Sequence, residues 1–331
     1  MLQLKNNTFF STGFAFFPNL QGVDTLYVMV KATFVIGSQW TLSEKQLPIY
    51  QSDEYWGVPG ESSLKQVGEY HIGKPATDIL MYGLACPLGQ RAVRQMDVGL
   101  EVGNIQKIVR VFGERRWERG QITSPELFAN MPLVYERAFG GSSASKDKNS
   151  PLISYEWNPS GKGFHQDPSE SVDGVILPNI EYTHELIQHA TDTPMPAGFG
   201  PIAPGWRPRA GLAGTYDQNW KTTRAPYLPD DFDPRFLNSA PADQIYSGFI
   251  KGGEKVRIVG MNPDTDFDFN LPYVNLVNKV RISGQEHSAP FYMETLALYP
   301  NQRCLTMTWR AALACGKSLL KIEEIVVNLS R

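Results

Sequence analysis

The sequence has little cysteine, and its cysteines follow no metal-binding or disulfide pattern. The 331 residues include only Cys86, Cys304 and Cys315, an odd set without Cys-x-x-Cys spacing. This argues against a disulfide framework and against a structural zinc site. Free thiols are typical of a reducing compartment, and the first residues lack the basic and apolar regions of a secretory signal. We therefore expect a cytoplasmic protein.

Long apolar runs and a large excess of one charge are also missing. The longest aromatic and apolar run covers residues 14–17, which is far too short to span a bilayer, so we expect no membrane insertion. The formal net charge is -3, and the densest basic group, Arg115, Arg116 and Arg119, is interrupted by glutamates. We interpret this group as a solvated turn and expect no nucleic-acid partner. The hydrophobic fraction of 42% is that of a globular protein.

No catalytic, metal-binding or cofactor-binding motif is complete. His184 and His189 are five residues apart, whereas the histidines of a zinc-protease helix must be four apart to share one face. Residues 316–318 (Gly-Lys-Ser) resemble the end of a phosphate-binding loop, but Ala311 stands where that loop needs an earlier glycine. We therefore expect no metal, no cofactor and no catalytic residue, and we expect the protein not to be an enzyme.

Strand patterns dominate both ends of the chain. Apolar residues alternate with others along 26–35 and, more cleanly, along 95–102, which places them on one face of a strand. Gly103-Asn104 then precedes another apolar-rich stretch, 105–112, and such a pair supplies the positive φ of a tight hairpin turn. Further strands are predicted at 291–299, 303–310 and 325–329, the first two as a second hairpin.

The middle of the chain differs from both ends. Between Pro194 and Pro234, thirteen of 41 positions are Gly or Pro, a content that helices and central strands do not tolerate. Six aromatic residues in the same segment argue against a disordered linker. We therefore predict ordered irregular structure there, and a mobile loop at 142–150.

The predicted fold is mainly β, with sandwich-like antiparallel sheets, a long ordered loop region rich in Gly, Pro and aromatic residues, and few short helices. Helix-forming residues gather only at 182–189 and 311–320. We expect one unit over residues 1–331, divided into a β-rich N-terminal part, an irregular part and a β-rich C-terminal part at 1–140, 141–240 and 241–331.

Short motifs without catalytic chemistry recur through the centre of the chain, such as Tyr-Glu-Arg-Ala-Phe-Gly-Gly at 135–141 and Asn-Pro-Ser-Gly-Lys-Gly-Phe at 158–164. Their glycines allow backbone angles that other residues resist, and their Asn and Asp side chains can fix turns. We expect structural or partner-binding roles for Tyr135, Glu136, Arg137, Gly140, Gly141, Asn158, Gly161, Gly163, Pro178, Asn179, Glu181, Gly198, Phe199, Gly200, Trp206, Arg209, Gly214, Tyr216, Asp217 and Trp220.

This ordered set, preceded by Lys-Ala-Thr-Phe at 31–34 and Lys-Pro-Ala-Thr-Asp at 74–78, resembles a bacterial family long catalogued as a domain of unknown function. Members of that family act as adaptors of type VI secretion effectors. The resemblance implies a cytoplasmic adaptor or chaperone that binds an effector protein, a probable toxin, and keeps it stable. It also implies a second partner, the spike protein of the secretion system, onto which the effector is loaded.

Two other functions remain open from the sequence. One is a hydrolase whose cleft is lined by Trp206, Tyr216 and Trp220, with Asp217 or Asp230 as the acid. The other is a carbohydrate-binding protein that uses the same aromatic side chains. Two carboxyl groups that face each other across a cleft, roughly 5–10 Å apart, would favour the hydrolase.

Overall fold

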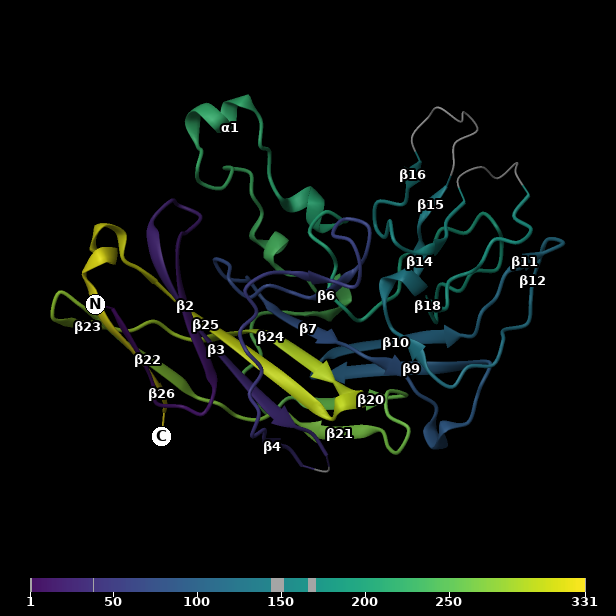
Figure 1. The fold of residues 1–331 in the computed structure, drawn as a ribbon, viewed down its shortest axis with the longest axis horizontal. Coiled ribbons are helices and arrows are strands. Elements are labelled where there is room, and N and C mark those ends of the chain that lie inside the picture. Colours follow the sequence, from purple (N-terminus) through teal and green to yellow (C-terminus); the bar gives the residue numbers. More distant parts are fainter. Residues whose placement is uncertain (1, 38, 144–151, 166–170, 331) are drawn as a thin grey trace.

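A computed structural model describes residues 2–330 of the chain, except 38, 144–151 and 166–170. Within these residues the fold is mainly β, as predicted (Figure 1). The largest sheet has the order β19-β7-β24-β25-β3-β2, with β4 paired to β3. Its strands are β2 (Ser11–Pro18), β3 (Asp24–Val35), β4 (Thr41–Leu42), β7 (Thr77–Met81), β19 (Ile245–Tyr246), β24 (Tyr292–Tyr299) and β25 (Cys304–Ala314).

A second sheet contains the hairpin that the sequence predicts. Its order is β18-β10-β9-β20-β21, and all neighbours are antiparallel. Val102 pairs with Ile105, so the chain turns at Gly103-Asn104, where Gly103 has a φ of 58°. The strands are β9 (Gln95–Val102), β10 (Ile105–Phe112), β18 (Ile180–Tyr182), β20 (Lys255–Val259) and β21 (Phe267–Asn270).

A third sheet, of order β1-β26-β22-β23, includes the predicted closing strand. Its strands are β1 (Gln3–Asn6), β22 (Leu276–Ile282), β23 (Gln285–His287) and β26 (Ile322–Leu329). The remaining strands form two-stranded pairs, namely β5 (Glu54–Tyr55) with β6 (Leu64–Gln66), β8 (Leu84–Ala85) with β13 (Met131–Pro132), β11 (Trp117–Glu118) with β12 (Gln121–Ile122), β14 (Phe139–Gly140) with β17 (Lys162–Gly163), and β15 (Ser142–Ser143) with β16 (Ile153–Ser154).

One apolar core joins the three large sheets. The alternating residues of β3, including Leu26 and Val28, pack in the same cluster as Leu305 of β25. Val98 of β9 and Ile325 of β26 belong to this cluster as well. The second predicted hairpin is also confirmed, because β24 and β25 are antiparallel neighbours joined by a short turn. Burial of these alternating rows is the main stabilising contribution to the fold.

The irregular central region is confirmed, and it contains the one α-helix of the described residues. This helix, α1 (Gln218–Thr223), stands on an excursion that rises above the largest sheet (Figure 1). We call residues 213–237 the α1 excursion. The 3-10 turns of the described residues are η1 (Leu88–Gln90), η2 (Tyr135–Arg137), η3 (Arg209–Leu212), η4 (Pro234–Leu237), η5 (Ala242–Gln244), η6 (Pro300–Gln302) and η7 (Gly316–Lys321). Within the described part of the chain, no helix is long and apolar enough to cross a membrane.

The helical expectation for 182–189 was wrong, and that for 311–320 holds only in part, because residues 316–320 lie in the 3-10 turn η7. Residues 311–314 continue β25, because Ala314 still pairs with Thr25 of β3 and the pairing outweighs the helix propensity of alanine. Residues 183–189 form a turn at 183–184 followed by irregular backbone, and the amide of Ile187 donates to the Glu181 carboxylate rather than within a helix. Of the predicted mobile loop, Ser142 and Ser143 belong to β15, and 144–150 lie outside the described residues.

Candidate functional site

The largest sheet is buried on both faces, and the two faces differ in polarity. On β3, Val30 packs in the apolar core, whereas Lys31 points to the opposite side of the sheet because strand residues alternate. On β25, Met307 lies in the core, and Thr308 and Arg310 belong to buried polar contacts. The second face is therefore covered by chain but lined with charged and polar side chains.

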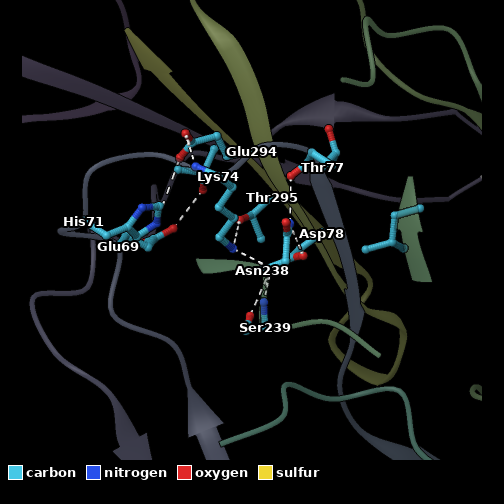
Figure 2. Close-up of polar contacts among 12 residues, drawn as sticks. Glu69, His71, Lys74, Thr77, Asp78, Asn238, Ser239, Glu294 and Thr295 are labelled. Atoms are coloured by element: carbon cyan, nitrogen blue, oxygen red, sulfur yellow. Dashed lines mark hydrogen bonds and ion pairs between the residues drawn. The ribbon is translucent and has the colours of Figure 1, made fainter. Parts of the chain in front are cut away.

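Three ion pairs form what we call the buried ion-pair network: Lys31–Glu69, Lys74–Asp78 and Arg310–Glu294. Every one of these side chains is at most 10% exposed. Each cation has a carboxylate partner, which buried charges require. The network joins four strands, β3, β7, β24 and β25, to the segments 69–74 and 238–239, as Figure 2 shows in part.

Asp78 is the most heavily used carboxylate of this network. Its Oδ2 atom lies 2.6 Å from Lys74 Nζ and accepts the Ser239 amide at 2.8 Å (Figure 2). Its Oδ1 atom accepts Asn238 Nδ2 at 2.7 Å, and Lys74 also donates to Thr295 Oγ1 at 2.8 Å. The motif at 74–78 therefore fixes the far end of the irregular region to the sheet.

Glu69 and His71 attach the preceding irregular segment to the same face. Lys31 Nζ donates to Glu69 Oε2 at 2.8 Å, and Thr308 Oγ1 donates to Glu69 Oε1 at 2.8 Å. His71 Nδ1 accepts the Gly73 amide at 3.1 Å, and Nε2 lies 3.2 Å from Arg310 Nη2. Burial, helped by the charge of Arg310, holds the pKa of His71 well below its usual value, so the imidazole is neutral at pH 7.

A second cluster gathers the motifs at 135–141 and 158–164. Asn158 is fully buried, and its Nδ2 donates to the carbonyl oxygens of Tyr135 and Phe139 at 2.8 and 3.0 Å. Gly140 has a φ of 146°, and a Cβ there would overlap the carbonyl oxygen of Asn158. Gly161 is equally crowded, because a Cβ would lie 2.6 Å from the carbonyl oxygen of Ala138. Glycine is therefore required where these two segments cross.

Glu136 and Arg137 tie this cluster to other segments by charge-assisted hydrogen bonds. The Glu136 carboxylate accepts the amide and the hydroxyl of Ser63, both at 2.7 Å. Arg137 Nη1 donates to Glu114 Oε1 at 2.9 Å and to Asn179 Oδ1 at 3.0 Å. Such bonds fix segments that have no strand ladder of their own.

Arg115 was misinterpreted at the sequence level as part of a solvated turn. Its side chain is only 6% exposed, donates to the Pro178 carbonyl at 2.8 Å and pairs with Glu181. The guanidinium carbon lies 3.6 Å from the centre of the Phe112 ring. Arg116 and Arg119 are exposed, as predicted. The two glutamates that interrupt the basic run hid this difference, because charge patterning alone does not show which arginine has a distant partner.

The segment 198–200 lies between the two clusters. Phe199 is fully buried, and a Cβ on Gly198 would touch the Tyr135 ring at 2.8 Å. Lys107 of β10 donates to the Gly198 carbonyl and to Asp243 Oδ1, the latter at 3.0 Å. Burial lowers the pKa of Lys107 to about 8, against the opposing effect of Asp243. At the end of this motif, the Gly200 carbonyl accepts a hydrogen bond from the Tyr135 hydroxyl at 3.4 Å.

Positive φ angles account for the other motif glycines. Gly141, Gly163 and Gly214 have φ angles of 101°, 93° and 80°. Gly163 packs against Pro178, and Gly214 against the turn that contains Asp231. Their role in the described residues is thus conformational, which is the usual reason for glycine at a positive φ.

The structure separates the aromatic residues that the hydrolase hypothesis places in one cleft. Trp206 is 2% exposed and packs edge-on against Tyr135, with ring centres 5.9 Å apart. Arg209 is buried beside it and donates to the Ile202 carbonyl at 2.6 Å. Tyr216 and Trp220 instead pack on each other on the α1 excursion, with ring centres 4.7 Å apart.

Asp217 and Asp230 line one small hollow of about 220 Å³ together with Trp220. Asp217 Oδ1 caps α1 by accepting the Trp220 amide at 2.8 Å. Asp230 Oδ1 lies 3.1 Å from Arg224 Nε. Within the described residues, no group of three or more His, Cys, Asp or Glu side chains is arranged to hold a metal ion.

Two larger surface pockets have mostly aromatic and aliphatic walls. One of about 470 Å³ lies beside the stacked rings of Tyr82 and Tyr299 and is bordered by Trp56. The other, of about 310 Å³, lies between the α1 excursion and the end of β2, with His71 in its wall. We call the second one the aromatic pocket; its rings are those of Phe17, Tyr70, Tyr216, Tyr227, Phe232 and Phe236.

Comparison with known proteins identifies a family. The family model described as "Uncharacterized protein conserved in bacteria (DUF2169)" matches residues 21–310. The match covers most of the chain and all of the second sheet, and the protein therefore belongs to this bacterial family. No curated protein and no solved structure matches the chain.

Proposed function

We propose that this member of the DUF2169 family is a cytoplasmic adaptor that binds a type VI secretion effector, stabilises it and helps to load it onto the secretion spike. The resemblance described above, which rests on motifs in the same order along the chain, supports the proposal. The buried ion-pair network and the close crossing of two segments at Gly140 and Gly161 supply the rigid support that a binding surface needs.

The observation that carries the proposal is the pair of surface pockets with aromatic walls. Both lie where an irregular segment meets the β framework, and both are bordered by partly exposed aromatic side chains, such as Trp56 and Tyr216. Binding energy in protein interfaces concentrates on aromatic residues that fill or line such pockets. A scaffold that fixes irregular segments around aromatic pockets is suited to hold another protein.

Co-purification from the native cells tests the proposal directly. The tagged protein should bring down one effector, and deletion of its gene should lower the level or the export of that effector while other effectors are still exported. The physical reason is mass action, because binding to the folded effector raises its stability in proportion to the logarithm of adaptor concentration over Kd. Normal levels and normal export of every effector in the deletion strain would contradict the proposal.

A hydrolase is the second candidate, and one observation favours it. Asp217, Asp230 and Trp220 line the same hollow. Asp217 accepts a hydrogen bond from the Trp220 amide and Asp230 forms an ion pair with Arg224, so both carboxylates have structural roles as well. If Asp217→Asn or Asp230→Asn abolishes function while effector binding stays normal, the adaptor proposal is wrong and the hydrolase takes its place.

A further inference from the structure

The aromatic pocket is shaped for a single side chain. Its volume of about 310 Å³ is at the lower end of the range for ligand pockets. A volume of this size is too small for a folded segment of a partner. Six aromatic rings contribute to its wall, from the end of β2, from the segment before β7 and from the α1 excursion. Aromatic faces carry negative partial charge and attract cations within about 6 Å of the ring centre.

Among the described residues no carboxylate lines the aromatic pocket itself, but three carboxylates are next to its lining residues Tyr216, Phe232 and Pro18 along the chain or across the strand pair. Asp217 and Asp231 lie on the excursion that forms one wall, and Asp24 faces Pro18 across the β2–β3 pair that forms another. Asp217 is bound to a backbone amide and Asp231 to Thr215, so neither charge is neutralised by these contacts.

Three cations lie on the same excursion, and two of them are already paired. Arg224 pairs with Asp230, and Arg235 pairs with Asp233. Lys221 is exposed on α1 and, among the described residues, has no carboxylate within ion-pair distance. Arg209, whose guanidinium lies on the Phe236 ring of the pocket, donates only to backbone carbonyls and has no ion-pair partner among the described residues. The three carboxylates of Asp24, Asp217 and Asp231 therefore exceed the two remaining cations, Lys221 and Arg209, by one.

The chain itself already places guanidinium groups on two rings of this pocket. Arg224 lies with its guanidinium carbon 5.8 Å from the centre of the Tyr227 ring, and Arg209 lies 5.1 Å from that of Phe236. A planar guanidinium stacks on aromatic faces better than an ammonium does, because it is delocalised and less strongly hydrated. His71 in the pocket wall is neutral and does not repel a cation.

We propose that the aromatic pocket binds an arginine side chain presented by the protein partner, with Tyr216 as its principal contact ring. Tyr216 is suited to this role because half of its surface is exposed while its other contacts hold it against Trp220. The carboxylates around the pocket supply the complementary charge. The identity of the partner rests on the proposed function, whereas the preference of the pocket for a guanidinium group does not.

A titration of the full-length protein tests the pocket by itself. The probes are N-acetyl-arginine amide and N-acetyl-citrulline amide, which have nearly the same shape but differ in charge, and the signals are the ring protons of the tyrosines in the NMR spectrum. The arginine probe should bind at least about 3-fold more tightly than the citrulline probe, and added salt should reduce the difference. Equal binding of the two probes, or binding of neither, would overturn the inference.

Matched variants localise the effect. Tyr216→Leu should weaken binding of the arginine probe by roughly 3- to 10-fold, while Tyr216→Phe, which keeps the ring, should bind as the wild type does. Asp24→Asn should weaken binding at low salt without loss of stability, because the Asp24 side chain is exposed at the start of β3. Unchanged affinity in Tyr216→Leu that retains the wild-type unfolding midpoint would also overturn the inference.

Effector capture separates the two proposals. If the wild type and Tyr216→Phe retain the effector and Tyr216→Leu releases it, both stand. If the effector is captured equally well by Tyr216→Leu and the arginine probe fails to bind, the pocket inference falls and the adaptor function remains. If the arginine probe binds as expected but no effector is captured by the wild type, the adaptor function falls and the pocket remains.

Discussion

Asp78→Asn should lower the free energy of unfolding by about 3–5 kcal/mol, because it leaves the buried Lys74 without its counter-charge. The side chains of Lys74 and Asp78 are 3% and 0% exposed, and their charged atoms are 2.6 Å apart. Asparagine keeps the size of the side chain, and its oxygen can still accept the Ser239 amide, but its NH2 group would face the Asn238 Nδ2 donor. The expected loss therefore combines the missing counter-charge with one missing hydrogen bond, and not a loss of packing.

The size of the effect makes it measurable by calorimetry. An unfolding entropy of about 2.1 cal/mol/K per residue gives roughly 0.7 kcal/mol/K for 331 residues. The loss then corresponds to a fall in Tm of about 4–7 °C. Urea unfolding followed by circular dichroism should show the same loss as a lower midpoint with an unchanged slope.

An exposed pair provides the matched control. Lys255 and Asp268 are 3.1 Å apart, with side chains 64% and 57% exposed, so Asp268→Asn should change stability by less than about 1 kcal/mol. The double variant Lys74→Met, Asp78→Asn should recover the electrostatic part of the loss, since no unpaired charge remains buried. If Asp78→Asn is as stable as Asp268→Asn, or if the double variant is less stable than the single one, the electrostatic reasoning is refuted.

Three further measurements probe other parts of the molecule. Lowering the pH from about 7 to about 5 should destabilise the wild type, because the pKa of His71 is lower in the folded state and the unfolded chain takes up the proton first. In urea titrations at the two pH values, His71→Gln should remove this part of the pH dependence. Gly140→Ala should lower the free energy of unfolding, measured in urea, by at least about 2 kcal/mol, because the added Cβ overlaps Asn158. Gly120→Ala should lower it by about 1 kcal/mol, because the space around Gly120 is open. Chelators and reductants should leave Tm unchanged, and a fall of several degrees in a chelator would show that a metal had been missed.

The strands were predictable because their pattern is local. The alternation along 26–35 and 95–102 and the Gly103-Asn104 turn are complete within a few residues, and the structure confirms each of them. The same alternation was misleading about polarity. A polar residue such as Lys31 between apolar neighbours normally marks the solvent face of a strand, yet this lysine is 1% exposed.

The partners of the buried charges were beyond prediction from sequence patterns. Lys31 pairs with Glu69, which is 38 residues away, and Asp78 binds Ser239 at a separation of 161 residues. The partner residues Glu69 and Ser239 lie in irregular segments that have no period to reveal which side chain points inward. The aromatic pocket was missed for the same reason, because its six rings come from three separate parts of the sequence.

The buried charges link the stability of the fold to the proposed binding surface. Each carboxylate of the buried ion-pair network accepts hydrogen bonds from particular partners, and we expect this to fix the positions of the irregular segments. Asp78 fixes residues 238–239, and Arg310 lies beside His71 in the wall of the aromatic pocket. A change in the network should therefore displace the pocket wall before it unfolds the sheet. Under conditions where Asp78→Asn remains folded, it should bind the arginine probe more weakly than Asp268→Asn does, and equal binding would show that the pocket is positioned without the network.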